Sequence, residues 1–191
     1  MTIPSLNEVA AYLTGVVKMV RGETEGLNYL DLSWRGFWRS FWAFAFSLPA
    51  YGVFWMSERN SLLASSPDIE LGAGFFLRAA VSDVAGVIAA ICAVAIAARP
   101  LGISDRFVQW VVAGNWLSLP LSYATAAVTL VSLGAVGSQG AAAPLLLIVV
   151  LVSLVITWRV YRVALDGDGL LALILLVISE FVFVLVSLVI S

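Results

Sequence analysis

Residues 170–190 read LLALILLVISEFVFVLVSLVI, and this stretch decides the fold class. Its one charged residue is Glu180. A helix needs about 20 apolar residues to cross the hydrocarbon core of a bilayer, and the stretch is of that length. Backbone amides in lipid must be paired within the segment, which favours a helix. The sequence therefore predicts a transmembrane helix at this position.

Four similar segments precede it, at residues 40–56, 76–98, 108–131 and 142–158. Of the 191 residues, 62% are hydrophobic and only 12% are charged, about half the charged share of a soluble domain. This composition excludes a soluble globular domain and a disordered chain. We expect an all-α fold: an integral membrane bundle of five transmembrane helices with an N-terminal amphipathic interfacial helix.

The N-terminal helix is predicted over residues 6–20. Its apolar residues recur at spacings of three and four, as on one face of a helix: Leu6, Val9, Ala10, Leu13, Val16, Val17 and Val20. Ser5 and Glu8 form a capping-box pattern that starts a helix, and Lys18 lies near its end. We expect this helix to lie in the membrane interface, with packing on the protein itself as the alternative.

A cluster of aromatic and basic residues leads into the first span. Aromatic rings gather at the boundary between membrane and water, and arginine side chains beside them can reach headgroup phosphates. The residues that we expect at this interface are Trp34, Arg35, Trp38, Arg39 and Trp42. The chain thus divides into a cytoplasmic amphipathic helix with an aromatic and basic interface segment, residues 1–36, and a five-helix transmembrane domain, residues 37–191.

Basic residues predict the orientation of the spans. Eight of them flank the side that holds the N-terminus: Lys18, Arg21, Arg35, Arg39, Arg99, Arg106, Arg159 and Arg162. The other side has Arg59 and Arg78. Because basic residues stay on the cytoplasmic side, we expect a cytoplasmic N-terminus in a bacterial inner membrane. Five spans then leave the C-terminus in the periplasm.

Polar residues inside the spans are the candidates for function: Glu180, Asn115, Asp83 and Arg78. A carboxylate in the middle of a bilayer is costly, so Glu180 should face the bundle and be protonated or paired. Asn115 is expected at a similar depth and is the predicted donor. Asp83 and Arg78 lie about 140° apart around their helix, which makes their pairing awkward. Two interpretations stay open: hydrogen bonds that hold helices together, or a path for protons or cations through Glu180, Asp83 and Asn115.

Small residues recur at every fourth position of two spans. In the second span they are Ala85, Ala89, Ala93 and Ala97, with Ser82, Gly86 and Ala90 alongside. In the third span they are Gly114, Ser118, Ser122 and Ala126. Small side chains let helix backbones approach closely in lipid. We therefore expect the second and third spans to pack tightly together, with a self-association face as the alternative.

Several kinds of chemistry are excluded. The chain has no histidine and one cysteine, Cys92, which leaves no histidine-based catalytic site, no usual zinc centre and no internal disulfide. We expect no metal, no cofactor and no enzymatic activity, and the net charge of −2 offers no basic surface for nucleic acid. Residues 166–169 read DGDG but lack the later ligands of a calcium loop, so we expect a turn in which Asp168 caps the last span.

The lead-in to the first span carries a family resemblance. Residues 26–33 read GLNYLDLS and residues 36–41 read GFWRSF, ahead of five closely spaced spans. In these features the chain resembles the Yip1-like family of small bacterial membrane proteins. The resemblance implies five spans with a cytoplasmic N-terminal segment, and it implies no catalytic site.

The predicted function is non-enzymatic. We expect a multi-pass inner-membrane protein that acts as a structural or accessory component and binds membrane lipids, other membrane proteins or a second copy of itself. The alternative is a small transporter, or a permease coupled to protons or cations, that uses Glu180.

Overall fold

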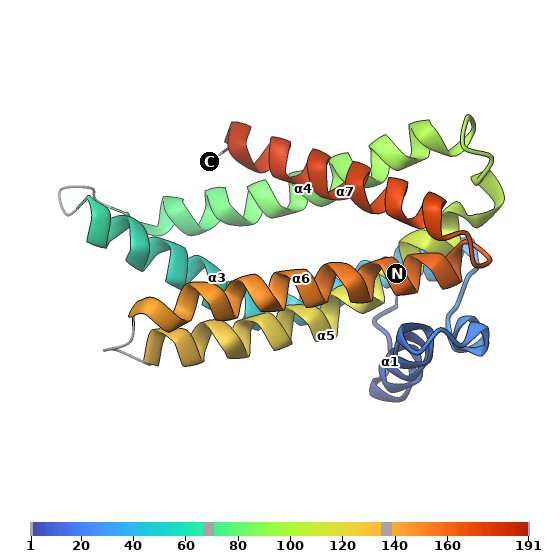
Figure 1. Ribbon diagram of the computed structural model, residues 1–191, viewed down its shortest axis with the longest axis horizontal. Coiled ribbons are helices and arrows are strands. Elements are labelled where there is room, and N and C mark those ends of the chain that lie inside the picture. Colours follow the sequence, from blue (N-terminus) through green and yellow to red (C-terminus); the bar gives the residue numbers. More distant parts are fainter. Residues whose placement is uncertain (1, 67–70, 135–138, 191) are drawn as a thin grey trace.

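The computed structural model describes residues 2–66, 71–134 and 139–190, and all regular structure in these residues is helical (Figure 1). Two short 3-10 helices are η1 (Thr24–Tyr29) and η2 (Ser104–Arg106). The α-helices are α1 (Leu6–Val20), α2 (Trp34–Ser40), α3 (Trp42–Ser65), α4 (Ala73–Ala98), α5 (Phe107–Gly134), α6 (Gln139–Ala164) and α7 (Gly169–Ile190). The all-α prediction is confirmed for these residues.

Helices α3 to α7 lie where the five apolar segments predict them. The main difference is that α3 continues to Ser65, nine residues beyond the end of the predicted span at residue 56. Among the described residues, three stretches are long and apolar enough to cross a membrane: Ala73–Ala98, Pro144–Ala164 and Gly169–Ile190. They indicate a membrane-embedded protein, and the count of five spans stays a prediction.

The long helices form two layers (Figure 1). One layer is the pair α4 and α7, which make the most extensive contact between helices among the described residues. The other layer holds α3, α5 and α6, and in it α5 packs on both α3 and α6. The prediction that the second and third spans pack tightly is therefore wrong, because α4 and α5 hardly touch.

A stripe of small residues on α4 meets α7. Ser82, Gly86 and Ala90 are buried, and the ring of Phe183 on α7 lies where a side chain at Gly86 would begin. Close approach at Gly86 lets the two helices pack along their length. The neighbouring alanine stripe, for example Ala85 and Ala89, is only partly buried.

Helix α1 begins with the capping box that the sequence predicts. Ser5 Oγ accepts from the Glu8 amide at 3.3 Å, and the Glu8 carboxylate accepts from the Ser5 amide at 2.7 Å. One face of α1 packs on α5, α6 and η1, where Val16 is 1% exposed and Met19 is fully buried. A second apolar stripe points outward, and on it Leu6 is 86% exposed.

The largest buried side chains gather at the end of the bundle that α1 covers. Met19 of α1, Ile103 between α4 and α5, Trp116 of α5 and Leu165 after α6 are all less than 2% exposed. The C-terminal end of α7 points toward the opposite end of the bundle (Figure 1). At the covered end, Asp168 caps α7 as predicted, since its Oδ1 accepts from the Leu171 amide at 2.9 Å.

Candidate functional site

Two adjoining cavities of about 240 and 310 Å³ lie between the two layers of helices. The residues that line both are Tyr51, Gly114, Ser118, Tyr161 and Glu180. Other polar side chains on the walls are Asn115, Ser122, Thr125, Ser153, Thr157 and Ser179. We call these two cavities the central chamber. Polar groups between membrane-embedded helices mark candidate functional sites, and Asn115, Ser122 and Ser179 of this set are buried.

The hydroxyl groups of the central chamber are oriented by their own helices. Ser118 and Ser179 each donate to the carbonyl oxygen three residues earlier, at 2.7 and 3.0 Å, and Thr157 donates to the carbonyl four residues earlier at 2.8 Å. Their oxygens remain available only as acceptors. No Lys or Arg is found among the described residues of the wall. The acceptor oxygens of these three residues suit a proton or a small cation, whereas the Tyr51 and Tyr161 hydroxyl groups on the same walls can donate as well as accept.

Glu180 lies at the border between the central chamber and an apolar groove. The groove has a volume of about 740 Å³ and is lined by α6 and α7, with Trp158 and Phe181 among its walls. The Glu180 side chain is exposed on the isolated bundle, and within the described chain no hydrogen bond or ion pair reaches its carboxylate. In a membrane such an acid needs a proton, a cation or a donor from outside the chain.

Asn115 does not supply that donor, so the predicted hydrogen bond from Asn115 to Glu180 is wrong. The buried Asn115 Nδ2 donates to Ser40 Oγ at 2.8 Å, and Ser40 in turn donates to the Phe37 carbonyl at 2.7 Å. Asn115 and Glu180 do line the same cavity, as their predicted depths require. The amide thus holds α5 against the junction of α2 and α3.

The hydrogen-bond partner of Asp83 is Trp55, which the sequence did not suggest. Its Oδ2 accepts from Trp55 Nε1 of α3 at 2.9 Å, which links α4 to α3. In the described part of the molecule no ion pair joins Asp83 to Arg78, although both line a pocket with Glu58. The structure therefore does not bring Asp83, Asn115 and Glu180 into one hydrogen-bonded chain.

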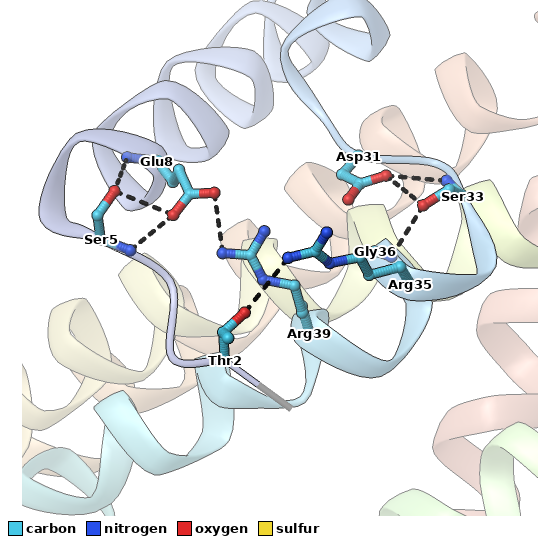
Figure 2. Close-up of polar contacts among 8 residues, drawn as sticks. All are labelled: Thr2, Ser5, Glu8, Asp31, Ser33, Arg35, Gly36 and Arg39. Atoms are coloured by element: carbon cyan, nitrogen blue, oxygen red, sulfur yellow. Dashed lines mark hydrogen bonds and ion pairs between the residues drawn. The ribbon is translucent and has the colours of Figure 1, made fainter.

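An ion pair fastens α1 to the start of the bundle. Arg39 donates to Glu8 Oε1 at 2.8 Å, and the two residues come from α2 and α1 (Figure 2). Helix α2 is capped by Ser33, whose Oγ accepts from the Gly36 amide at 3.1 Å and donates to Asp31 at 2.6 Å. This cap aims Arg39 at the first turn of α1.

The same pair changes the acid strength of Glu8. Hydrogen bonding to the Ser5 amide, and then to Arg39, lowers the pKa of the Glu8 carboxyl to about 2. Arg39 is only 8% exposed, so it differs from its predicted place among headgroups.

The remaining interface residues keep a surface position. Trp34 and Trp38 are exposed, Arg35 is exposed and contacts Thr2, and Trp42 is half-buried (Figure 2 shows Arg35). They form an aromatic and basic rim beside α1.

Sequence reasoning missed three contributors to these sites. Ser40, Trp55 and Tyr161 lie in or beside apolar runs and look like ordinary span residues. Their contacts are made with helices that are distant in sequence, which no local pattern reveals. The available signal is that each carries a polar group within or beside an apolar segment.

The described residues hold no group of three His, Cys, Asp or Glu side chains that could bind a metal ion. The sites offer one acid in a cavity lined by hydroxyl groups, a second acid beside an indole, and two grooves with mainly apolar walls. No family model, no curated protein and no solved structure matches the chain.

Proposed function

We propose that the protein is a non-enzymatic accessory component of a membrane complex, anchored in the bacterial inner membrane by five helices. In this proposal α3 and α5 span the bilayer together with the three more apolar helices, and α1 lies in the cytoplasmic interface. The N-terminus is cytoplasmic and the C-terminus periplasmic. The architecture is also the basis of the resemblance to the Yip1-like family, which stays a prediction.

The observation that supports the accessory role is Glu180 at the edge of the groove between α6 and α7. A lipid-facing acid without a donor in the described chain is stabilised when a partner supplies one. We propose that the partner is a transmembrane helix that fills this groove and donates a hydrogen bond to Glu180. Small and polar contacts of this kind are what associate helices in lipid.

A second candidate function is a permease for protons or small cations. It is favoured by the acceptor oxygens of the central chamber, which face Glu180 without a basic residue among the described wall. Here Glu180 would take up a proton or cation in place of a partner helix.

Replacement of Glu180 by Gln separates the two functions. Glutamine keeps the size and the hydrogen-bonding capacity of the side chain but neither ionises nor binds a cation well. If the accessory role is correct, Glu180→Gln should still co-purify with the same stoichiometric partner in mild detergent, whereas Glu180→Leu should lose it. Thermal melts of both variants report whether they fold.

The permease is tested in the same preparations. Wild-type protein in liposomes should then carry protons or cations, measured with a pH-sensitive dye under an imposed gradient, and Glu180→Gln should abolish the flux. Flux without a partner would contradict the accessory role. Partner binding that survives Glu180→Leu would contradict the proposed contact.

A further inference from the structure

An apolar groove of about 630 Å³ opens between α3 and α4, two helices that make few contacts with each other. Aromatic side chains such as Phe41 and Phe44 form one wall, and aliphatic side chains such as Val84 and Ile88 form the other. Ile88 is 54% exposed, so the groove faces the surroundings of the bundle. Its volume is in the range of about 300–1,000 Å³ that is typical of small-molecule sites.

One acid interrupts this apolar lining. Asp83 is the charged side chain among the described residues of the groove. Trp55 donates to Asp83 Oδ2 at 2.9 Å, and the Trp55 ring stacks on Tyr51 with 6.1 Å between the ring centroids. Over the described chain this indole is the one hydrogen-bond donor to the carboxylate, and no ion pair reaches it. The acid therefore lies beside two aromatic rings with only a neutral donor.

We propose that the groove between α3 and α4 binds lipophilic monovalent cations, with Asp83 as the counter-charge. A buried or lipid-facing carboxylate is unfavourable without an opposite charge, and a cation supplies one. The faces of Tyr51 and Trp55 attract the same charge through their π-electrons. The apolar body of such a ligand fills the rest of the groove against Phe44 and Ile88.

Other occupants fit the groove less well. An acyl chain of a neutral lipid would cover the apolar walls but leave Asp83 without a counter-charge. An anionic amphiphile would be repelled by the carboxylate. A dissolved metal ion or a hydrophilic amine has no apolar surface to bury against the aromatic and aliphatic walls. The combination of one acid, two rings and an apolar cleft selects a ligand that is both cationic and lipid-soluble.

This site is distinct from the groove at Glu180, so the proposal goes beyond the proposed function and does not depend on it. The test uses the full-length protein in phosphatidylcholine nanodiscs. The probes are tetraphenylphosphonium, which is cationic, and tetraphenylsilane, a neutral molecule of the same shape. We expect the wild-type protein to bind the cation about tenfold or more tightly than the neutral probe, as measured by equilibrium binding.

Asp83→Asn should remove this preference, because the amide still accepts from Trp55 but carries no charge. Ile88→Trp should weaken both probes by narrowing the groove while leaving the acid in place. Asp105→Asn removes an acid in η2, outside the groove, and should change neither affinity. Thermal melts show whether each variant is folded.

Equal affinity for the two probes in the wild-type protein, or no binding of either, would overturn the proposal. So would a cation preference that survives Asp83→Asn. Loss of the preference in Glu180→Gln with no loss in Asp83→Asn would assign the cation to the central chamber and would also reject the groove between α3 and α4. The failure of this site thus leaves the proposed partner contact of Glu180 open to its own test.

Discussion

The buried amide of Asn115 shows how a single polar group is satisfied inside an apolar bundle. It donates to Ser40 Oγ, and the Ser40 hydroxyl donates onward to the Phe37 carbonyl. Ser40 is fully buried, so loss of either partner leaves the other without water to replace it. This relay ties α5 to the C-terminal end of α2.

We predict that Ser40→Ala lowers the free energy of unfolding by about 1 kcal/mol, which lies between the average of about 0.6 kcal/mol and the maximum of about 1.7 kcal/mol for hydrogen bonds between membrane helices. Asn115→Leu should have a similar effect, and the double variant should lose little more than either single variant, because both remove the same bond. Detergent unfolding monitored by circular dichroism measures all three.

The control for this pair is Glu180. Because Asn115 and Glu180 share no hydrogen bond, the effects of Asn115→Leu and Glu180→Leu should add. A strong coupling energy between the two substitutions would support the hydrogen bond from Asn115 to Glu180 that the sequence suggested, and would contradict the relay through Ser40.

At the scale of elements, α1 has two distinct apolar faces. Tyr12, Val16 and Met19 pack against the bundle, whereas Leu6 and Val17 are exposed on a separate apolar stripe. The sequence predicted one apolar face and treated the membrane interface and the protein surface as alternatives. Because the two apolar faces lie side by side, α1 can pack on the bundle with one face and contact the membrane interface with the other. An exposed apolar stripe beside the aromatic rim is well suited to lie in the interface.

We predict that Leu6→Asp with Val17→Asp releases this stripe from lipid without undoing the packed face. A probe at Ala10→Cys, in a Cys92→Ala background, should then react severalfold faster with a water-soluble maleimide. The matched control is Asn7→Asp with Thr14→Asp, which places the same charges on the polar face and should leave the reaction slow. An unchanged rate in the first variant would mean that the stripe never contacts lipid.

The positions of the helices were predictable and their neighbours were not. Long apolar runs and caps at Ser5 and Asp168 define helices locally, because backbone pairing in lipid leaves few alternatives. Packing partners depend on which small stripe is used. The stripes through Ala85 and Gly86 have the same spacing, and the ring of Phe183 packs against Gly86 of the second stripe. The partner that we predicted for Asn115 was wrong for the same reason, because local sequence patterns do not show which helices pack together.

At the scale of the whole molecule, polar and apolar contacts are distributed unequally between the two ends. The ion pairs of the described residues join Lys18 to two glutamates, Glu8 to Arg39, and Arg106 to Asp166. All of them lie at the end that α1 covers, together with the largest buried side chains. This end is the one that basic residues predict to be cytoplasmic.

We predict that this end is cytoplasmic and that all five long helices span. A reporter enzyme that is active only in the periplasm should be active after Ser191 and inactive at Gly167. A third fusion at Gly102 tests the count of spans. With five spans this turn is cytoplasmic, whereas with only the three most apolar helices spanning it would be periplasmic. Activity at Gly102 would therefore reject the five-span arrangement.

The pairing of α4 with α7 also has a consequence for how the protein is made. Residues 99–168 separate the two helices in the chain, and a ribosome adds about 5–20 residues per second. For several seconds after α4 enters the membrane, its small stripe through Gly86 has no native neighbour. The helix that covers this stripe, α7, leaves the ribosome only after α5 and α6. The pairing of α4 with α7 is therefore a late step in the assembly of this bundle, and until α7 has been made α4 is open to insertion chaperones and to membrane proteases.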